Sequence, residues 1–139
     1  MANSSLKDNI YSYLNGQASL TALLDTGGIG WGQMPDNHIT KKMIIYSMIS
    51  DVRIPDSYFR NQRWRFWLCF PATGTNPKAA CLTAANKLLD IMHEIRGSFG
   101  SVNIHFSENV SNQDPFYDKD SNSWIIIQDY ALKMKTLEV

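Results

Sequence analysis

The most constraining feature of this sequence is a long helical repeat with recognisable start and stop residues. The Asn76 side chain can cap a helix, and Pro77 at the first helical position loses no hydrogen bond. Gly97 is a residue at which helices commonly end. Between them, apolar residues recur at intervals of three and four: Cys81, Ala84, Ala85, Leu88, Ile91, Met92 and Ile95. The repeat predicts an amphipathic helix over residues 77–96 that lays one face on a sheet.

Two strand-like runs before this helix predict a long β-hairpin. Residues 42–52 are apolar on both faces, as expected for a strand in the interior of a sheet. Residues 63–70 alternate, with Trp64, Phe66, Leu68 and Phe70 on one face and Arg63, Arg65, Trp67 and Cys69 on the other. Residues 53–62 contain a proline and several turn formers, and they connect the two strands.

The remaining elements are shorter or less regular. Residues 102–106 predict a third strand, residues 107–123 a polar loop, and a fourth strand begins at Trp124. In the last strand Tyr130, Leu132 and Met134 alternate with Lys133 and Lys135, which is typical of a half-exposed antiparallel strand.

The N-terminal region predicts two short helices followed by a loop. The first helix is capped by Ser4 or Ser5 and ends at Gly16, and its apolar residues are Leu6, Ile10, Tyr13 and Leu14. The second helix is capped by Ser19, and its apolar residues are Leu20, Leu23 and Leu24. Residues 28–37 are rich in Gly, Pro and Asn, so they predict a loop or irregular strand. Its large side chains, Ile29, Trp31 and Met34, are expected to tuck under the domain.

Together these elements predict one α+β domain over residues 1–139. It has a mostly antiparallel sheet of four or more strands, with the long helix packed on one face and short N-terminal helices. The 13 Lys and Arg balance the 13 Asp and Glu, so the chain has no basic surplus for non-specific binding to nucleic acid. No apolar run approaches the roughly 20 residues of a membrane helix, and no secretory signal is evident. We therefore expect a soluble protein without a membrane partner, which stays where it is made.

Motifs for metal or catalytic chemistry are weak. Residues 118–122 with Asp129 superficially match a calcium-binding loop, but Ser123 stands where the turn needs Gly, so a solvated acidic loop is the better interpretation. His38, His93 and His105 lack the spacing of a zinc site. The two cysteines, Cys69 and Cys81, have no CxxC spacing and are expected to be reduced core residues. We expect no enzyme activity, no metal and no cofactor.

A basic and aromatic cluster surrounds the predicted hairpin. Its members are Arg53, Arg60, Arg63 and Arg65, interleaved with Tyr58, Phe59, Trp64 and Trp67. Arg, Tyr and Trp are the side chains most enriched at the energetic centres of protein interfaces. The alternative is an ordinary outer sheet face on which Arg stems pack against aromatic neighbours.

Six segments along the chain carry a family resemblance. They are residues 10–14 (IYSYL), 20–24 (LTALL), 30–35 (GWGQMP), 43–49 (MIIYSMI), 64–70 (WRFWLCF) and 79–89 (AACLTAANKLL). In layout and apolar pattern the chain resembles the tail terminator (tail completion) proteins of long-tailed bacteriophages. The resemblance covers nearly the whole chain and includes no catalytic motif.

This resemblance implies an α+β virion protein at the tail-head junction, assembled in the cytoplasm of the host bacterium. It implies a homo-hexameric ring on the end of the tail tube, which stops tube growth and presents a surface to the head-side connector protein. Its partners would be copies of itself, the tail tube protein and the connector, with transient passage of DNA through the lumen. Function on this interpretation lies in shape and surface.

A ring needs a heterologous interface, in which one face of a subunit meets a different face of the next. We expect the hairpin around residues 58–65 and the loop at residues 111–123 to supply this contact or the contact to the tail tube. The candidate residues are Tyr58, Phe59, Arg60, Arg63, Arg65, Phe116, Tyr117, Asp118 and Asp120. Charge reversal at Arg60 together with Arg63 is expected to weaken assembly and leave the domain folded.

Two alternatives stay open. One is another virion role, as a head-tail connector or minor tail protein, which binding to purified tail tubes or to portal-bearing heads distinguishes. The other is a small-ligand-binding or metal-binding α+β enzyme, which copurification of a metal would favour.

Overall fold

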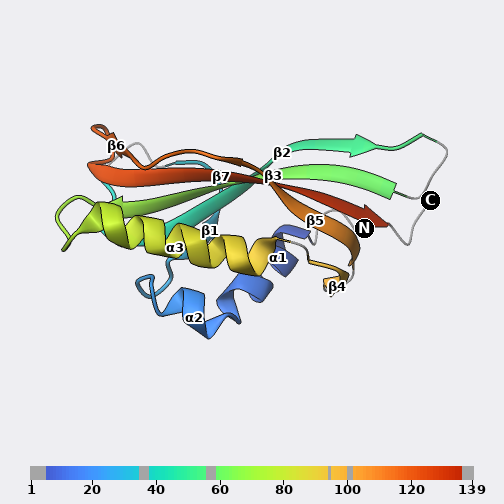
Figure 1. Cartoon of the computed structure of the whole chain (residues 1–139), viewed down its shortest axis with the longest axis horizontal. Coiled ribbons are helices and arrows are strands. Elements are labelled where there is room, and N and C mark those ends of the chain that lie inside the picture. Colours follow the sequence, from blue (N-terminus) through green and yellow to red (C-terminus); the bar gives the residue numbers. More distant parts are fainter. Residues whose placement is uncertain (1–5, 35–37, 56–58, 94, 100–101, 136–139) are drawn as a thin grey trace.

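The computed structural model describes residues 6–34, 38–55, 59–93, 95–99 and 102–135. Within these residues the chain forms three helices and a seven-stranded sheet, and the helices cover one face of the sheet (Figure 1). The helices are α1 (Leu6–Asn15), α2 (Ala18–Thr21) and α3 (Pro77–Met92). The strands are β1 (Ile29–Trp31), β2 (Met43–Arg53), β3 (Phe59–Pro71), β4 (Gly97–Phe99), β5 (Val102–Asn112), β6 (Phe116–Asp118) and β7 (Ser123–Lys135).

The sheet has the order β1-β2-β3-β7-β5-β4, and β6 pairs with the first residues of β7. All of these pairs are antiparallel except β1 with β2. The prediction of an α+β fold with a mostly antiparallel sheet, a helix on one face and short N-terminal helices is therefore confirmed. The three-residue strand β1 lies where a loop or irregular strand was predicted, whereas β4, also of three residues, was not predicted because it is too short to show a period.

The main core lies between the sheet and the helices. Strand β3 buries its predicted face, Trp64, Phe66, Leu68 and Phe70, and α3 adds Cys81, Ala84, Ala85, Leu88 and Met92. The ring of Phe66 lies between two tyrosines, with centroids 5.7 Å from Tyr46 and 5.5 Å from Tyr130. Such contacts between aromatic rings stabilise a core beyond the area that they bury. The helical layer is thus fixed to the middle of the sheet.

A smaller cluster lies on the opposite face of the sheet, near β6. It consists of Ile39, Ile45, Cys69 and Ile125, with Met34, Met43, Trp67 and Ile127 packed against it. Both cysteines are free and buried, and burial raises the pKa of each thiol to about 12. The prediction of reduced core cysteines is therefore confirmed.

Helix α3 starts at Pro77 as predicted, but its cap and its end differ from the prediction. Asn76 has a left-handed φ of 46°, and its side chain makes no capping hydrogen bond, since a side-chain cap requires extended backbone at this position. The helix ends at Met92 instead of residue 96. There the buried Ser107 hydroxyl from β5 donates to the Met92 carbonyl and accepts from the Ile95 N–H, both at 2.6 Å. This tertiary contact turns the chain toward β4, where Gly97 has a φ of 104°.

The predicted loop over residues 107–123 is mostly strand. β5 continues to Asn112, and β6 precedes the turn into β7. Two register shifts interrupt β5, at His105 and at Val110. Each bulge moves the following side chains to the other face, which hides the period of two from sequence analysis.

Three smaller expectations near the N-terminal half were wrong. Trp31 is 57% exposed instead of tucked under the domain, although Ile29 is buried. β2 is buried on both faces only in its first half, because β1 pairs with no residue beyond Tyr46. Gln17, and not Ser19, stands at the start of α2. The caps expected at Ser4 or Ser5 lie outside the described residues.

We predict that Ser107→Ala lowers the free energy of unfolding by about 1–3 kcal/mol, because it removes the hydrogen-bonding partner of the Met92 carbonyl and the Ile95 N–H. Urea denaturation followed by tryptophan fluorescence measures this change. Ser111→Ala on the same strand is the control, since Ser111 accepts a hydrogen bond through its backbone carbonyl. Equal losses in the two variants would contradict the assignment.

Candidate assembly surfaces

Strands β2 and β3 continue past the end of α3, so that this end of the sheet projects beyond the helical layer (Figure 1). Beyond Tyr46 the outer edge of β2 pairs with no strand among the described residues. This free edge exposes three apolar side chains, Met48, Ile49 and Val52, and Val52 is 58% exposed. An open strand edge with exposed apolar side chains is a typical place for another chain to bind.

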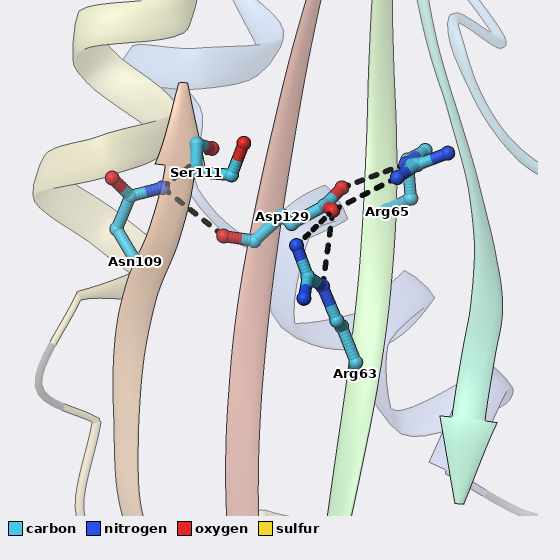
Figure 2. A network of polar contacts seen from close by, with 5 residues as sticks. All are labelled: Arg63, Arg65, Asn109, Ser111 and Asp129. Carbon is cyan, nitrogen blue, oxygen red and sulfur yellow. Dashed lines mark hydrogen bonds and ion pairs between the residues drawn. The ribbon is translucent and has the colours of Figure 1, made fainter. Parts of the chain in front are cut away.

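A buried carboxylate organises the helix-free face of the same region. The Asp129 side chain on β7 is 1% exposed and accepts four hydrogen bonds from two arginines of β3 (Figure 2). Arg65 donates hydrogen bonds to both carboxylate oxygens, with Nε 2.8 Å from Oδ1 and Nη2 3.0 Å from Oδ2. Arg63 places Nε and Nη2 3.1 and 2.8 Å from Oδ2. Neighbouring Asn109 on β5 donates to the Asp129 carbonyl, so the network spans three strands.

The charges of this network explain its pKa shifts. Burial raises the pKa of the Asp129 carboxyl, but the hydrogen bonds from Arg65 and then Arg63 outweigh burial, and the net pKa is lowered. The hydrogen bond to Asp129 likewise raises the pKa of Arg65. Two cations share one anion here, and the arginine side chains remain 44% and 35% exposed. The network therefore joins the strands and leaves one net positive charge at the surface.

The other predicted hairpin arginine is also paired. Arg60 on β3 donates from Nε and Nη2 to the two carboxylate oxygens of Asp51 on β2, at 3.1 and 2.7 Å. Both side chains are largely buried, at 24% and 19% exposure. This ion pair ties the projecting ends of the two strands together. Reversing the charges of Arg60 and Arg63 would therefore break structural ion pairs, so that variant does not isolate an effect on assembly.

An open depression lies on the helix-free face, further along β7 toward its C-terminal end than Asp129. We call it the basic socket, and its lining residues are Arg96, His105, Phe106 and Lys133. Arg96 lies over the Phe106 ring and Lys133 over the Phe59 ring, each 5.2 Å from the ring centroid. The His105 ring meets the Phe59 ring edge-on at 5.4 Å. The ring faces attract these cations, so the contacts hold both positively charged side chains in place beside aromatic surface.

The other end of the sheet carries an acidic and aromatic projection. We call residues 114–122 the acidic hairpin, because it contains three aspartates and one lysine and consists of β6 with its turn. Phe116, Tyr117 and Asp120 are exposed. Asp118 accepts hydrogen bonds from the backbone and side chain of Ser121, which fixes the turn. Beside it lies a groove lined by Met34, Trp67, Phe116, Asp118, Asp120, Ile125 and Ile127.

The predicted site residues thus fall into two groups at opposite ends of the sheet. Tyr58 lies outside the described residues, Phe59 supports the basic socket, and Arg60, Arg63 and Arg65 are ion-paired. Phe116, Tyr117, Asp118 and Asp120 form the acidic hairpin. The pairing of Asp129 with arginines and the basic socket were not predicted from the sequence. One sequence feature could have pointed to the buried role of Asp129, since it is a single carboxylate within the apolar run of the last strand.

The described part of the chain contains no group of three or more His, Cys, Asp or Glu side chains placed to hold a metal ion. Within the same residues, no helix has both the length and the apolar character needed to cross a membrane.

These features define an α+β protein with helices on one face of a mixed sheet and two chemically different ends. No protein family and no curated protein matches the sequence. Among solved structures, a chain from the virion of the native gene transfer agent (GTA) particle has a similar fold. The TM-score is 0.69, the match covers 91% of each chain, and 12% of residues are identical. This similarity establishes the fold.

We predict that the Asp129 network stabilises the fold in a pH-dependent way. Its carboxyl pKa is lower in the folded chain than in the unfolded chain, so its contribution is present above about pH 3.9 and is lost as the pH falls through the folded value. Asp129→Asn should lower the free energy of unfolding by about 1–3 kcal/mol at neutral pH. Urea unfolding at a series of pH values should show that the difference from the parent shrinks in acid.

Asp120→Asn is the matched control, since Asp120 is exposed in the turn. Its stability should stay within about 0.5 kcal/mol of the parent. A constant difference between Asp129→Asn and the parent at all pH values would contradict the role of the ion network.

Proposed function

We propose that this protein is a structural component of a phage-like virion and caps the tail tube as a tail terminator. The observation that carries the proposal is the match to a chain of the GTA virion, which extends over 91% of both chains. A match of this extent includes both the long sheet and its helical layer. A shared local motif would match only a small part of the chain. The resemblance in sequence layout supports the same role independently.

The surfaces of the molecule support a role in assembly over a role in catalysis. The projecting end of the sheet is held rigid by two ion-paired clusters, at Asp51 and at Asp129. Its free edge leaves Met48, Ile49 and Val52 exposed. A rigid projection with an exposed apolar edge is suited to binding another protein with little ordering cost.

In this role six copies form a closed ring on the end of the tail tube, at the tail-head junction. One side of the ring binds the tail tube protein and ends its polymerisation, and the other side presents a surface to the head-side connector protein. The lumen lets DNA pass during ejection. The protein is made in the cytoplasm of the host bacterium and assembles there into the virion.

The first test measures the mass of the purified protein by light scattering across a concentration series, with negative-stain images of the same samples. We expect a six-membered ring, or a monomer that forms a ring when tail tubes built from the tube protein of the same genome are added. A stable dimer whose mass changes neither with protein concentration nor with added tubes would refute the terminator role. Binding to portal-bearing heads and not to tubes would favour a head-tail connector instead.

We further predict that Ile49→Lys with Val52→Lys weakens tube capping by about tenfold or more, because charges on the free edge of β2 oppose strand pairing and apolar burial. Growth of tube protein filaments in the presence of each variant measures capping. Leu82→Lys on α3 is the matched control, since Leu82 is an equally exposed apolar residue on the helical side. Equal capping by both variants would exclude this edge from the contact.

A further inference from the structure

We propose that the acidic hairpin of one copy of this chain docks into the basic socket of a second copy. The inference rests on the proposed ring and names the contact that joins its subunits. It commits to one occupant for the socket, a second copy of the same chain.

The two surfaces are complementary in charge. The acidic hairpin has three aspartates against one lysine, a formal charge of −2, while the socket holds the two cations Arg96 and Lys133. Glu108 lies two residues beyond Phe106 on β5 and is exposed, so it bounds the positive region on one side. Complementary charges of this kind steer association and fix which surfaces meet.

The two surfaces are also complementary in their apolar groups. The hairpin exposes the rings of Phe116 and Tyr117, and the socket contains the rings of His105 and Phe106. Tyr117 is held from within, because its hydroxyl donates to Asn122 Oδ1 at 2.6 Å and its ring contacts Trp124. The hairpin is therefore ordered before it meets a partner, which lowers the entropic cost of docking.

The two surfaces of one chain cannot reach each other. The hairpin leads into β7 at Ser123, and the socket includes Lys133 near the end of the same strand. A strand rises about 3.3 Å per residue, so about 30 Å separates them along β7. Figure 1 shows β6 and the projecting end of the sheet on opposite sides of the molecule. The contact is therefore between copies, and its use once per subunit in each direction gives a head-to-tail ring when the rotation between neighbouring subunits closes.

A pair of charge-reversal variants tests this contact. The hairpin variant is Asp114→Arg with Asp120→Arg, and the socket variant is Arg96→Glu with Lys133→Glu. Each alone places like charges against each other, so we expect self-association at least tenfold weaker than that of the parent. An equimolar mixture restores opposite charges at every contact, and we expect it to assemble as the parent does. Sedimentation velocity measures assembly, and circular dichroism verifies that each variant is folded.

The control reverses charges of the same kind on α3, away from both surfaces, with Lys87→Glu and Asp90→Arg. These two variants should assemble as the parent does. The contact would be refuted if the hairpin and socket variants assembled normally, or if their mixture did not restore assembly. Neither result would refute the ring itself. If the parent forms only a dimer, and the two variants lose this dimer separately but regain it when mixed, the contact is supported and the ring is refuted. A parent that stays monomeric, with and without tube ends, would overturn the inference.

Discussion

The antiparallel pairing of β3 with β7 is the interaction on which the rest of the structure depends. Each strand has 13 residues, and each residue of β3 has a partner on β7. Because side chains alternate between faces, this register decides what each face contains. It buries Phe66 near Tyr130 on the helical face, and it sets Arg65 directly opposite Asp129 on the other. A slip of one residue would destroy the core and the ion network together.

The fold could be predicted from the sequence only where a segment keeps one hydrophobic period, of a helix or of a strand, without interruption. Residues 63–70 and the start of α3 keep a single period, and their faces were predicted correctly. β5 has bulges at His105 and Val110, which erase the alternation that identifies a strand. The end of α3 depends on Ser107, a contact with a residue distant in the sequence. Local patterns contain no information about such a contact.

The same limit applies to the candidate surfaces. The arginines were recognised from composition, but their partner Asp129 lies more than 60 residues away and is brought close only by the register of β3 with β7. The basic socket combines Arg96, a bulged His105 and Lys133, which share no sequence motif. The acidic hairpin was the easier case, because its residues are consecutive in the sequence.

A chain with a net charge of zero need not have a neutral surface everywhere. The long ladder separates the acidic hairpin from the basic socket, so the balanced charges become a molecule with two unlike ends. In the proposed ring every hairpin would meet a socket, whereas an open row of subunits leaves one of each exposed. Where the rotation between subunits closes, the last contact forms within one assembly, so it costs little further entropy. The separation of charge along β7 therefore favours head-to-tail assembly, and a ring that closes leaves neither charged surface exposed.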